Sequence, residues 1–167
     1  LEDIKKTSRV YPFIRFNQGK KIHNKVVEVE NISKAYDNLS IIKKFTMTIN
    51  SGDRIAVIGE NGIGKTTFLK CLVDNTFANT GSIRWSENAT IGYFAQNHSE
   101  EFKSNISIID WMAKWSHKDD DLETIRGTLG RLLFSQDDIN KPIGVLSGGE
   151  QRRMLFGKII LQRANVI

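Results

Sequence analysis

Cysteine, proline and long apolar runs are all scarce in this chain of 167 residues. The single cysteine, Cys71, cannot form an internal disulfide bond or a cysteine-based metal cluster, so we expect a small buried apolar residue. No apolar run is long enough to cross a bilayer, and no stretch resembles a signal peptide. Apolar and charged contents of 40% and 26% are typical of a globular protein, and a reducing, cytoplasmic environment fits them.

The net charge of +5 is concentrated at the start of the chain. Residues 1–25 contain seven basic and two acidic side chains, so the rest of the chain is neutral as a whole. Pro12 and the lack of helical periodicity predict an extended segment there, whose aromatic residues pack on a neighbouring surface or stack on bases. Two interpretations stay open, namely a solvated linker and an arm that follows a phosphate backbone.

One stretch organises the rest of the chain, and it reads Gly59-Glu60-Asn61-Gly62-Ile63-Gly64-Lys65-Thr66-Thr67. It matches the phosphate-binding P-loop G-x-x-x-x-G-K-[ST] without a mismatch. Its glycines let several backbone N–H groups face one anion, while Lys65 supplies a mobile cation and Thr66 a hydroxyl that can ligate Mg²⁺. The apolar run Arg54–Ile58 predicts a buried parallel strand before the loop, and residues 66–73 predict a helix after it. The sequence therefore predicts a nucleoside triphosphate site.

Short alternating segments surround this loop. A strand at 26–29, a turn at 36–40 and a strand at 44–50 predict an antiparallel pair. Further short strands are expected at 82–85 and 89–94.

Helical periodicity dominates after Asn97. Helices are expected over 106–115, after Asp119-Asp120-Asp121, and from Ser147 to about Arg163. The three aspartates are interpreted as a helix cap rather than as a metal site. His23, His98 and His117 are taken as surface residues.

A second glycine-rich stretch, Leu146-Ser147-Gly148-Gly149-Glu150, opens the last helix. Ser147 followed three residues later by Glu150 predicts a capping box. The two glycines leave the N–H groups of the helix mouth without covering side chains, so this mouth can receive a phosphate.

Together these motifs resemble the ATP-binding-cassette (ABC) ATPases. Residues 59–67 are similar to the Walker A motif and 146–150 to the signature motif, while Gln96 is similar to the Q-loop glutamine and Tyr36 to the aromatic residue that stacks on adenine. The Glu150-Gln151 pair and the stretches 85–89, 130–139 and 153–158 resemble the second ATPase domain of a bacterial ABC-F protein. Residues 1–16 resemble the end of the linker between the two domains of such a protein.

The resemblance implies an α/β fold of the ABC type, with a mixed β core around the P-loop, an antiparallel β subdomain and a helical subdomain that carries the signature. It implies a basic linker end over 1–24 and an ABC domain over 25–167. ATP would be bound by Tyr36, Gly59, Asn61, Gly62, Ile63, Gly64, Lys65, Thr66, Thr67 and Gln96, and Mg²⁺ by Thr66 and Gln96. The implied partners are a first ABC domain, on whose P-loop the signature would act, and the ribosome with its rRNA and tRNA, without membrane insertion.

Three elements of the family pattern would follow the signature helix, namely the Walker B strand with its Asp, the catalytic Glu and the switch His. They lie beyond Ile167, so we expect this chain alone to bind ATP weakly and to hydrolyse almost none. Two alternatives to the ABC-F interpretation stay open, an ATPase subunit of a membrane transporter and a degenerate, non-catalytic cassette.

Overall fold

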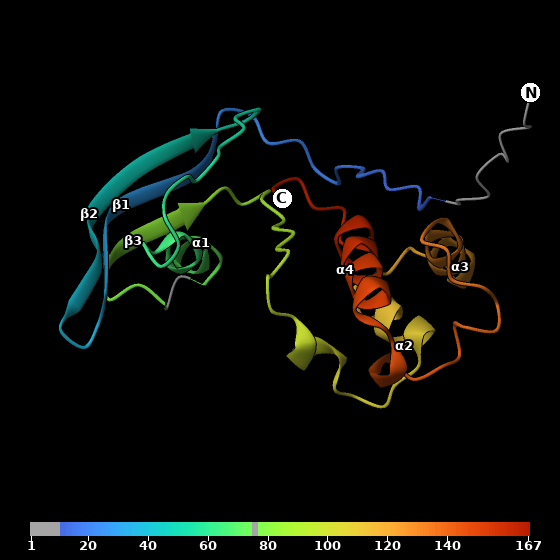
Figure 1. Ribbon diagram of the computed structural model, residues 1–167. Helices are drawn as coiled ribbons and strands as arrows, with labels where there is room; N and C mark the ends of the chain where they lie inside the picture. The colour runs from blue at the N-terminus through green and yellow to red at the C-terminus, as the bar shows by residue number, and fades with distance from the viewer. Residues whose placement is uncertain (1–10, 75–76) are drawn as a thin grey trace, which may run out of the picture. The chain divides into compact units, whose positions relative to one another are not determined.

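The computed structural model describes residues 11–74 and 77–167, which form two compact units (Figure 1). The β unit comprises residues 20–91 with Val166, and the helical unit comprises residues 11–19 and 92–165 with Ile167. Strands and helices are both present, which confirms the predicted α/β class. The division at 24/25 into linker and ABC domain stays a prediction. Residues 1–10, which carry part of the expected linker, lie outside the described residues.

The β unit is built on an antiparallel sheet with the strand order β2-β1-β3. Its strands are β1 Lys25–Tyr36, β2 Leu39–Asn50 and β3 Thr80–Trp85, so the predicted hairpin is confirmed and both of its strands are longer than expected. Asp37 turns the chain between β1 and β2 with a φ of 49°, a conformation that aspartate tolerates better than most residues.

Helix α1, Lys65–Val73, supplies the core of the β unit (Figure 1). Cys71 and Leu72 on α1 are buried with Val27, Val29 and other apolar residues of β1 and β3. The predicted burial of Cys71 is therefore confirmed, and burial raises the pKa of its thiol. This packing fixes the helix that follows the P-loop against the sheet.

The strand expected over residues 54–58 is not formed, and the prediction was wrong. These residues have no regular secondary structure, and Ile58 is 90% exposed. A parallel strand needs a neighbouring strand that accepts and donates its backbone hydrogen bonds. Among the described residues nothing pairs with 54–58, and the sheet around α1 contains only antiparallel pairs. The strand expected at 89–94 is likewise reduced to one parallel bridge between Ile91 and Val166.

The helical unit contains α2 Ile108–Ala113, α3 Leu122–Arg131 and α4 Gly148–Leu161, which pack against one another (Figure 1). Two short 3₁₀ helices, η1 Ser99–Phe102 and η2 Ile143–Val145, lie in the connecting segments. All three predicted helices are confirmed, although α2 is shorter than expected. Ser107 is the N-cap of α2, and its hydroxyl accepts a hydrogen bond from Asp110 N.

The core of the helical unit lies where α2, α3 and α4 meet. Met112, Leu129, Leu132, Met154 and Leu155 are fully buried there. Gly157 lets the helices approach closely, because a Cβ at that position would lie 2.5 Å from Met112 Cε and 2.7 Å from Leu132 Cδ1. The absence of a side chain at this one position thus shapes the packing of α4.

The third of the three consecutive aspartates caps a helix, as predicted. Asp121 is the N-cap of α3, and its carboxylate accepts a hydrogen bond from Thr124 N at 2.8 Å, which lowers the pKa of Asp121. Asp120 is nearly buried and forms an ion pair with Arg163. No cluster of metal-ligating side chains occurs in residues 11–74 and 77–167.

The extended segment 11–19 packs on the helical unit. Phe13 N donates to Arg131 O at 2.9 Å, Ile14 packs on the helical core, and the rings of Phe16 and Phe156 are 6.4 Å apart. Tyr11 and Phe13 are 74% and 59% exposed, so their rings keep free surface. Within the described ranges, no helix has the length and apolar character needed to cross a membrane.

Candidate nucleotide-binding site

The P-loop adopts the backbone conformation that its glycines allow. Gly62 and Gly64 have φ values of 85° and 109°, in the left-handed region that other residues rarely adopt. Gly64 is the N-cap of α1, and no side chain caps this end of the helix. A Cβ on Gly64 would overlap Cγ2 of Ile41 from β2, so glycine is required there on two grounds. The loop therefore presents its backbone at the positive end of the α1 dipole.

The side chain of Lys65 folds back onto the P-loop. Its Nζ donates to Gly59 O and to Glu60 O, both at 2.7 Å. These two carbonyls hold the ammonium at the mouth of the loop, where a polyphosphate would replace them as the partner. Asn61, Ile63 and Thr66 are exposed beside it, and Thr67 is half-buried.

A cavity of about 480 Å³ adjoins the P-loop within the β unit. Its lining combines Ile63, Gly64 and Lys65 with apolar side chains of β2 and of residues 55–58. The walls are mainly apolar and the ammonium of Lys65 lies beside the loop, and such a combination of apolar walls with a few placed polar groups is typical of small-molecule sites. The side chains of Ile41 and Phe45 in this wall were not anticipated from the sequence.

Tyr36, the residue expected to stack on adenine, lies at the end of β1 and is 46% exposed. Its ring meets the ring of Phe77 edge-on at 6.3 Å. Lys34 Nζ lies 5.3 Å from the Tyr36 ring and 4.1 Å from the Phe77 ring, a cation–π contact with both. Strand alternation places Lys34 and Tyr36 on the same face and could have identified Lys34, whereas no sequence signal indicated Phe77.

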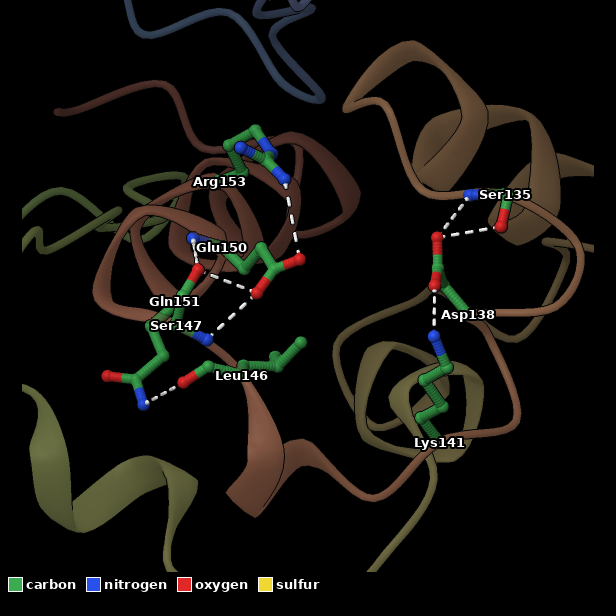
Figure 2. A network of polar contacts seen from close by, with 8 residues as sticks. All are labelled: Ser135, Asp138, Lys141, Leu146, Ser147, Glu150, Gln151 and Arg153. Atoms are coloured by element: carbon green, nitrogen blue, oxygen red, sulfur yellow. Dashed lines mark hydrogen bonds and ion pairs between the residues drawn. The ribbon is translucent and has the colours of Figure 1, made fainter.

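The signature stretch forms the predicted capping box at the start of α4 (Figure 2). Ser147 Oγ accepts from Glu150 N at 3.4 Å, and Ser147 N donates to Glu150 Oε2 at 2.8 Å. The Ser147 hydroxyl also donates to Glu150 Oε2 at 2.6 Å. Gln151 Nε2 donates to Leu146 O at 3.1 Å, which fixes the residue before the cap. The helix mouth is therefore held by bonds between residues at most five positions apart.

The same contacts determine the charge distribution at the N-terminus of α4. The Ser147 hydroxyl and backbone N–H hold the pKa of Glu150 below its ordinary value of 4.5. Gly148 and Gly149 are exposed, and no other group lies within 4 Å of the place where a Cβ would stand. The backbone N–H groups at this end of α4 are thus open to an anionic ligand.

A second polar turn lies near the capping box in the helical unit (Figure 2). Asp138 accepts from Ser135 N at 3.0 Å, from Ser135 Oγ at 2.7 Å and from Lys141 Nζ at 2.6 Å. Lys141 and then Ser135 hold the pKa of Asp138 well below its usual range, and Asp138 in turn raises the pKa of Lys141. No sequence pattern predicted this network.

The expected site residues are divided between the two units. Tyr36 and residues 59–67 belong to the β unit, and Gln96 and the signature belong to the helical unit. Gln96 is exposed at a bend. His98 was expected at the surface, and this was wrong, because its half-buried ring lies between those of Phe94 and Phe102. His23 and His117 are exposed as expected.

The groups around Lys65 fit a nucleotide with its magnesium ion. The Lys65 ammonium held by two carbonyls, the N–H groups at the N-terminus of α1 and the exposed Thr66 hydroxyl together supply donors for phosphate oxygens and one oxygen ligand for Mg²⁺. Residues 42–167 match the family described as "ABC transporter". The chain belongs to the ABC transporter family.

Curated relatives of this ABC cassette include a protein named as a member of the ABC transporter F family. The cassette is 48% identical over 167 residues to the ATP-binding protein YbiT of Escherichia coli O157:H7, covering 100% of this chain and 32% of that protein. It is 34% identical to the ABC transporter ATP-binding protein YkpA of Bacillus subtilis, covering 100% and 31%. With ABC transporter F family member 5 of Arabidopsis thaliana it shares 30% identity, covering 92% and 22%. The resemblance to a bacterial ABC-F protein is confirmed, and the cassette spans about a third of the first two of these relatives.

Solved structures support the fold of the ABC cassette. A metal-chelate type ABC transporter in an inward-facing conformation aligns with a TM-score of 0.53 and 23% identity, over 83% of this chain and 56% of that one. The protein cbiO1 of Clostridium perfringens aligns with a TM-score of 0.54 and 18% identity, over 85% and 63%. At such identities the likeness concerns the fold alone. The predicted ABC-type fold class is thereby confirmed.

Proposed function

We propose that this cassette binds and, in the full-length protein, hydrolyses ATP as one of two ABC domains of an ABC-F protein that acts on the ribosome in translation. The main observation in support is that a complete P-loop and a complete signature occur in a chain 48% identical along its whole length to YbiT. Membership of the family implies nucleotide binding. ATP hydrolysis, binding to the ribosome and pairing with a first ABC domain are the further parts of this proposal.

The geometry supports a defined role for each group. Lys65 exchanges its two carbonyl partners for phosphate oxygens, and the N–H groups of Gly62 and Gly64 bind the same phosphates. Thr66 and Gln96 are the residues that would hold the magnesium ion, which would neutralise charge on the phosphates. Tyr36 stacks on the adenine, and its free ring surface favours this role.

The signature serves a second nucleotide. Its open helix mouth at Gly148 and Gly149 binds the phosphates of ATP held by the P-loop of a first ABC domain in the same protein. ATP that contacts both domains only when they are closed favours closure, and its hydrolysis releases them.

The ribosome is the proposed partner, at a cytoplasmic location. Arg15, Lys20, Lys21 and Lys25 are exposed, and so are Tyr11 and Phe13, which supports contact of the first segment with RNA. Cationic side chains bind a phosphate backbone, and aromatic rings stack on unpaired bases. Such binding weakens steeply as the salt concentration rises.

The test uses the full-length protein in two measurements. With ATP and the purified protein, we expect hydrolysis by the wild type and loss of nearly all of it in Lys65→Met. In cell extracts fractionated with a nonhydrolysable ATP analogue, we expect the protein to sediment with ribosomes rather than with membranes. Lys70→Met is the matched control, because Lys70 is an exposed lysine of the same helix α1 that lies outside the P-loop.

Each outcome decides part of the proposal. Absence of wild-type hydrolysis supports a non-catalytic cassette instead, and sedimentation with membranes supports the ATPase of a transporter. Equal losses in Lys65→Met and Lys70→Met would remove the assigned role of Lys65. Insensitivity of ribosome binding to salt would remove the electrostatic contact of the first segment.

A further inference from the structure

A nearly buried lysine on the signature helix has one anionic partner and one aromatic partner. The side chain of Lys158 on α4 is 14% exposed, and its Nζ lies 2.6 Å from Glu101 Oε2. The same Nζ lies 4.1 Å from the centre of the Trp115 ring. An ammonium removed from water to this degree needs such compensation, and loss of its partner leaves an unpaired buried charge.

This contact joins two segments that are 57 positions apart in sequence. Glu101 lies in η1, five residues after Gln96, and Lys158 lies on the helix that the signature opens. On the other side of Gln96, the ring of Phe94 lies 4.8 Å from that of Phe156, two positions before Lys158. The loop that carries Gln96 is therefore attached to α4 at both of its ends.

We propose that Glu101 and Lys158 are positioning residues for ATP hydrolysis, because they fix the far end of the Gln96 loop to the signature helix, while the Trp115 ring supports the Lys158 ammonium. The inference rests on the proposed function, in which Gln96 contacts the magnesium ion of bound nucleotide. A loop held at both ends transmits a displacement of Gln96 to α4, whereas a loop held only at Phe94 swings about that point. Glu101 and Lys158 act through Gln96 and α4 and touch no nucleotide themselves.

The test is a double-mutant cycle in the full-length protein with Glu101→Gln, Lys158→Met and both together. We expect each single variant to lower kcat by about tenfold while KM for ATP stays within about twofold of wild type, the range that mutations along coupling contacts produce. The double variant should be no slower than the slower single variant, because the pair is lost only once. Lys158→Arg, which keeps a cation over Trp115, should retain at least half of the wild-type kcat.

The chain offers a matched control. Glu100 stands beside Glu101 in η1 and pairs with Lys103, but both of these side chains are largely exposed. Glu100→Gln should leave kcat and KM unchanged. If Lys158→Met does not fold, Glu101→Gln with Lys158→Arg carries the test, since Glu101 lies nearer the surface and retains 32% exposure.

Several outcomes would overturn the inference. A wild-type kcat in Glu101→Gln, a loss that appears only in KM, or single effects that multiply in the double variant each contradict it. A loss in Glu100→Gln equal to that in Glu101→Gln contradicts it as well. Failure of the proposed function is distinguishable, because the wild-type protein itself then hydrolyses no ATP, and this result overturns both.

Discussion

The P-loop and the signature are both glycine-rich turns at the start of a helix, but different contacts hold them. The first turn of α4 is fixed by a capping box between Ser147 and Glu150, and Gln151 donates a hydrogen bond to Leu146 O. The N-terminus of α1 has no side-chain cap, and residues 54–58 before it have no regular secondary structure. The signature is thus held by neighbours in sequence, and the P-loop by Lys65 and by packing on β2.

This difference has a functional consequence. The bonds that shape the signature join residues of the signature and its helix, so we expect them to persist when a phosphate binds. At the P-loop, Lys65 is bonded to Gly59 O and Glu60 O, which are groups that ligand binding replaces. We therefore expect the P-loop to depend on its ligand for order and the signature to depend on its cap. Changes at the two places should separate these dependences.

The largest effect is expected from Gly64→Ala. The alanine would meet Ile41 and would also be held at a φ of 109°, so strain and overlap add to about 3 kcal/mol, or about a hundredfold weaker ATP binding. Gly62→Ala, with a φ of 85° and open space around it, should cost only about tenfold. Titration of a fluorescent ATP analogue measures both. Adding Ile41→Ala to Gly64→Ala should restore ATP binding to the level of Gly62→Ala. If Gly64→Ala alone already bound ATP as tightly as Gly62→Ala, the proposed overlap of the new Cβ with Ile41 would be contradicted.

On the signature side, the largest effect on stability is expected from Gly157→Ala. The added methyl group must displace Met112 and Leu132, both fully buried, at a cost of about 1–3 kcal/mol. Urea unfolding followed by circular dichroism measures it. Gly127→Ala in α3 is the matched control, because no group lies within 4 Å of its Cβ position, and it should stabilise the helix by about 0.5–1 kcal/mol. A neutral Gly157→Ala would show that the helices separate freely there.

The same contrast explains how much could be predicted from the sequence. Helix α1, the capping box of Ser147 and Glu150 and the Asp121 cap depend on residues within a few positions, so their patterns are legible in the sequence. The strand at 54–58 was predicted wrongly because its formation depends on a neighbouring strand, which the apolar pattern alone does not supply.

Contacts between distant segments were missed for a related reason. Lys158 and Glu101 are ordinary charged residues in the sequence, and only folding places one on the other. Phe77 beside Tyr36 and the aromatic surroundings of His98 are of the same kind. The motif residues could be proposed from the sequence because phosphate binding would require them at fixed spacing, while the residues that support them follow from tertiary packing.

A smaller effect, of about 1 kcal/mol at neutral pH, is expected from Ser147→Ala. The Ser147 bonds lower the pKa of Glu150, so their contribution to stability is present above the ordinary value of 4.5 and is lost as the pH falls through the lowered pKa. The difference between Ser147→Ala and wild type should therefore shrink in acid, as urea unfolding at several pH values would show. Ser147→Thr keeps the hydroxyl and should stay near wild type. A difference independent of pH would exclude the role of Glu150.

The smallest effect is expected from Asp138→Asn, in the turn near the signature. Its partner Lys141 is 54% exposed and the carboxylate itself is 32% exposed, so solvent screens their attraction and the loss should be less than that of Ser147→Ala. The pKa of Asp138 is lowered in the folded chain, so the stabilisation is present above the ordinary value of 3.8 and is lost as the pH falls through the lowered pKa. Wild type should accordingly be more stable than Asp138→Asn at pH 7, and the free energies of unfolding of the two proteins should converge below pH 3.8.

Raising the salt concentration at pH 7 should narrow the difference in stability between wild type and Asp138→Asn, because the exposed ion pair is screened, while leaving the effect of Ser147→Ala nearly unchanged. A gap that resists salt would assign the turn to the hydrogen bonds of Ser135 rather than to the charge of Lys141.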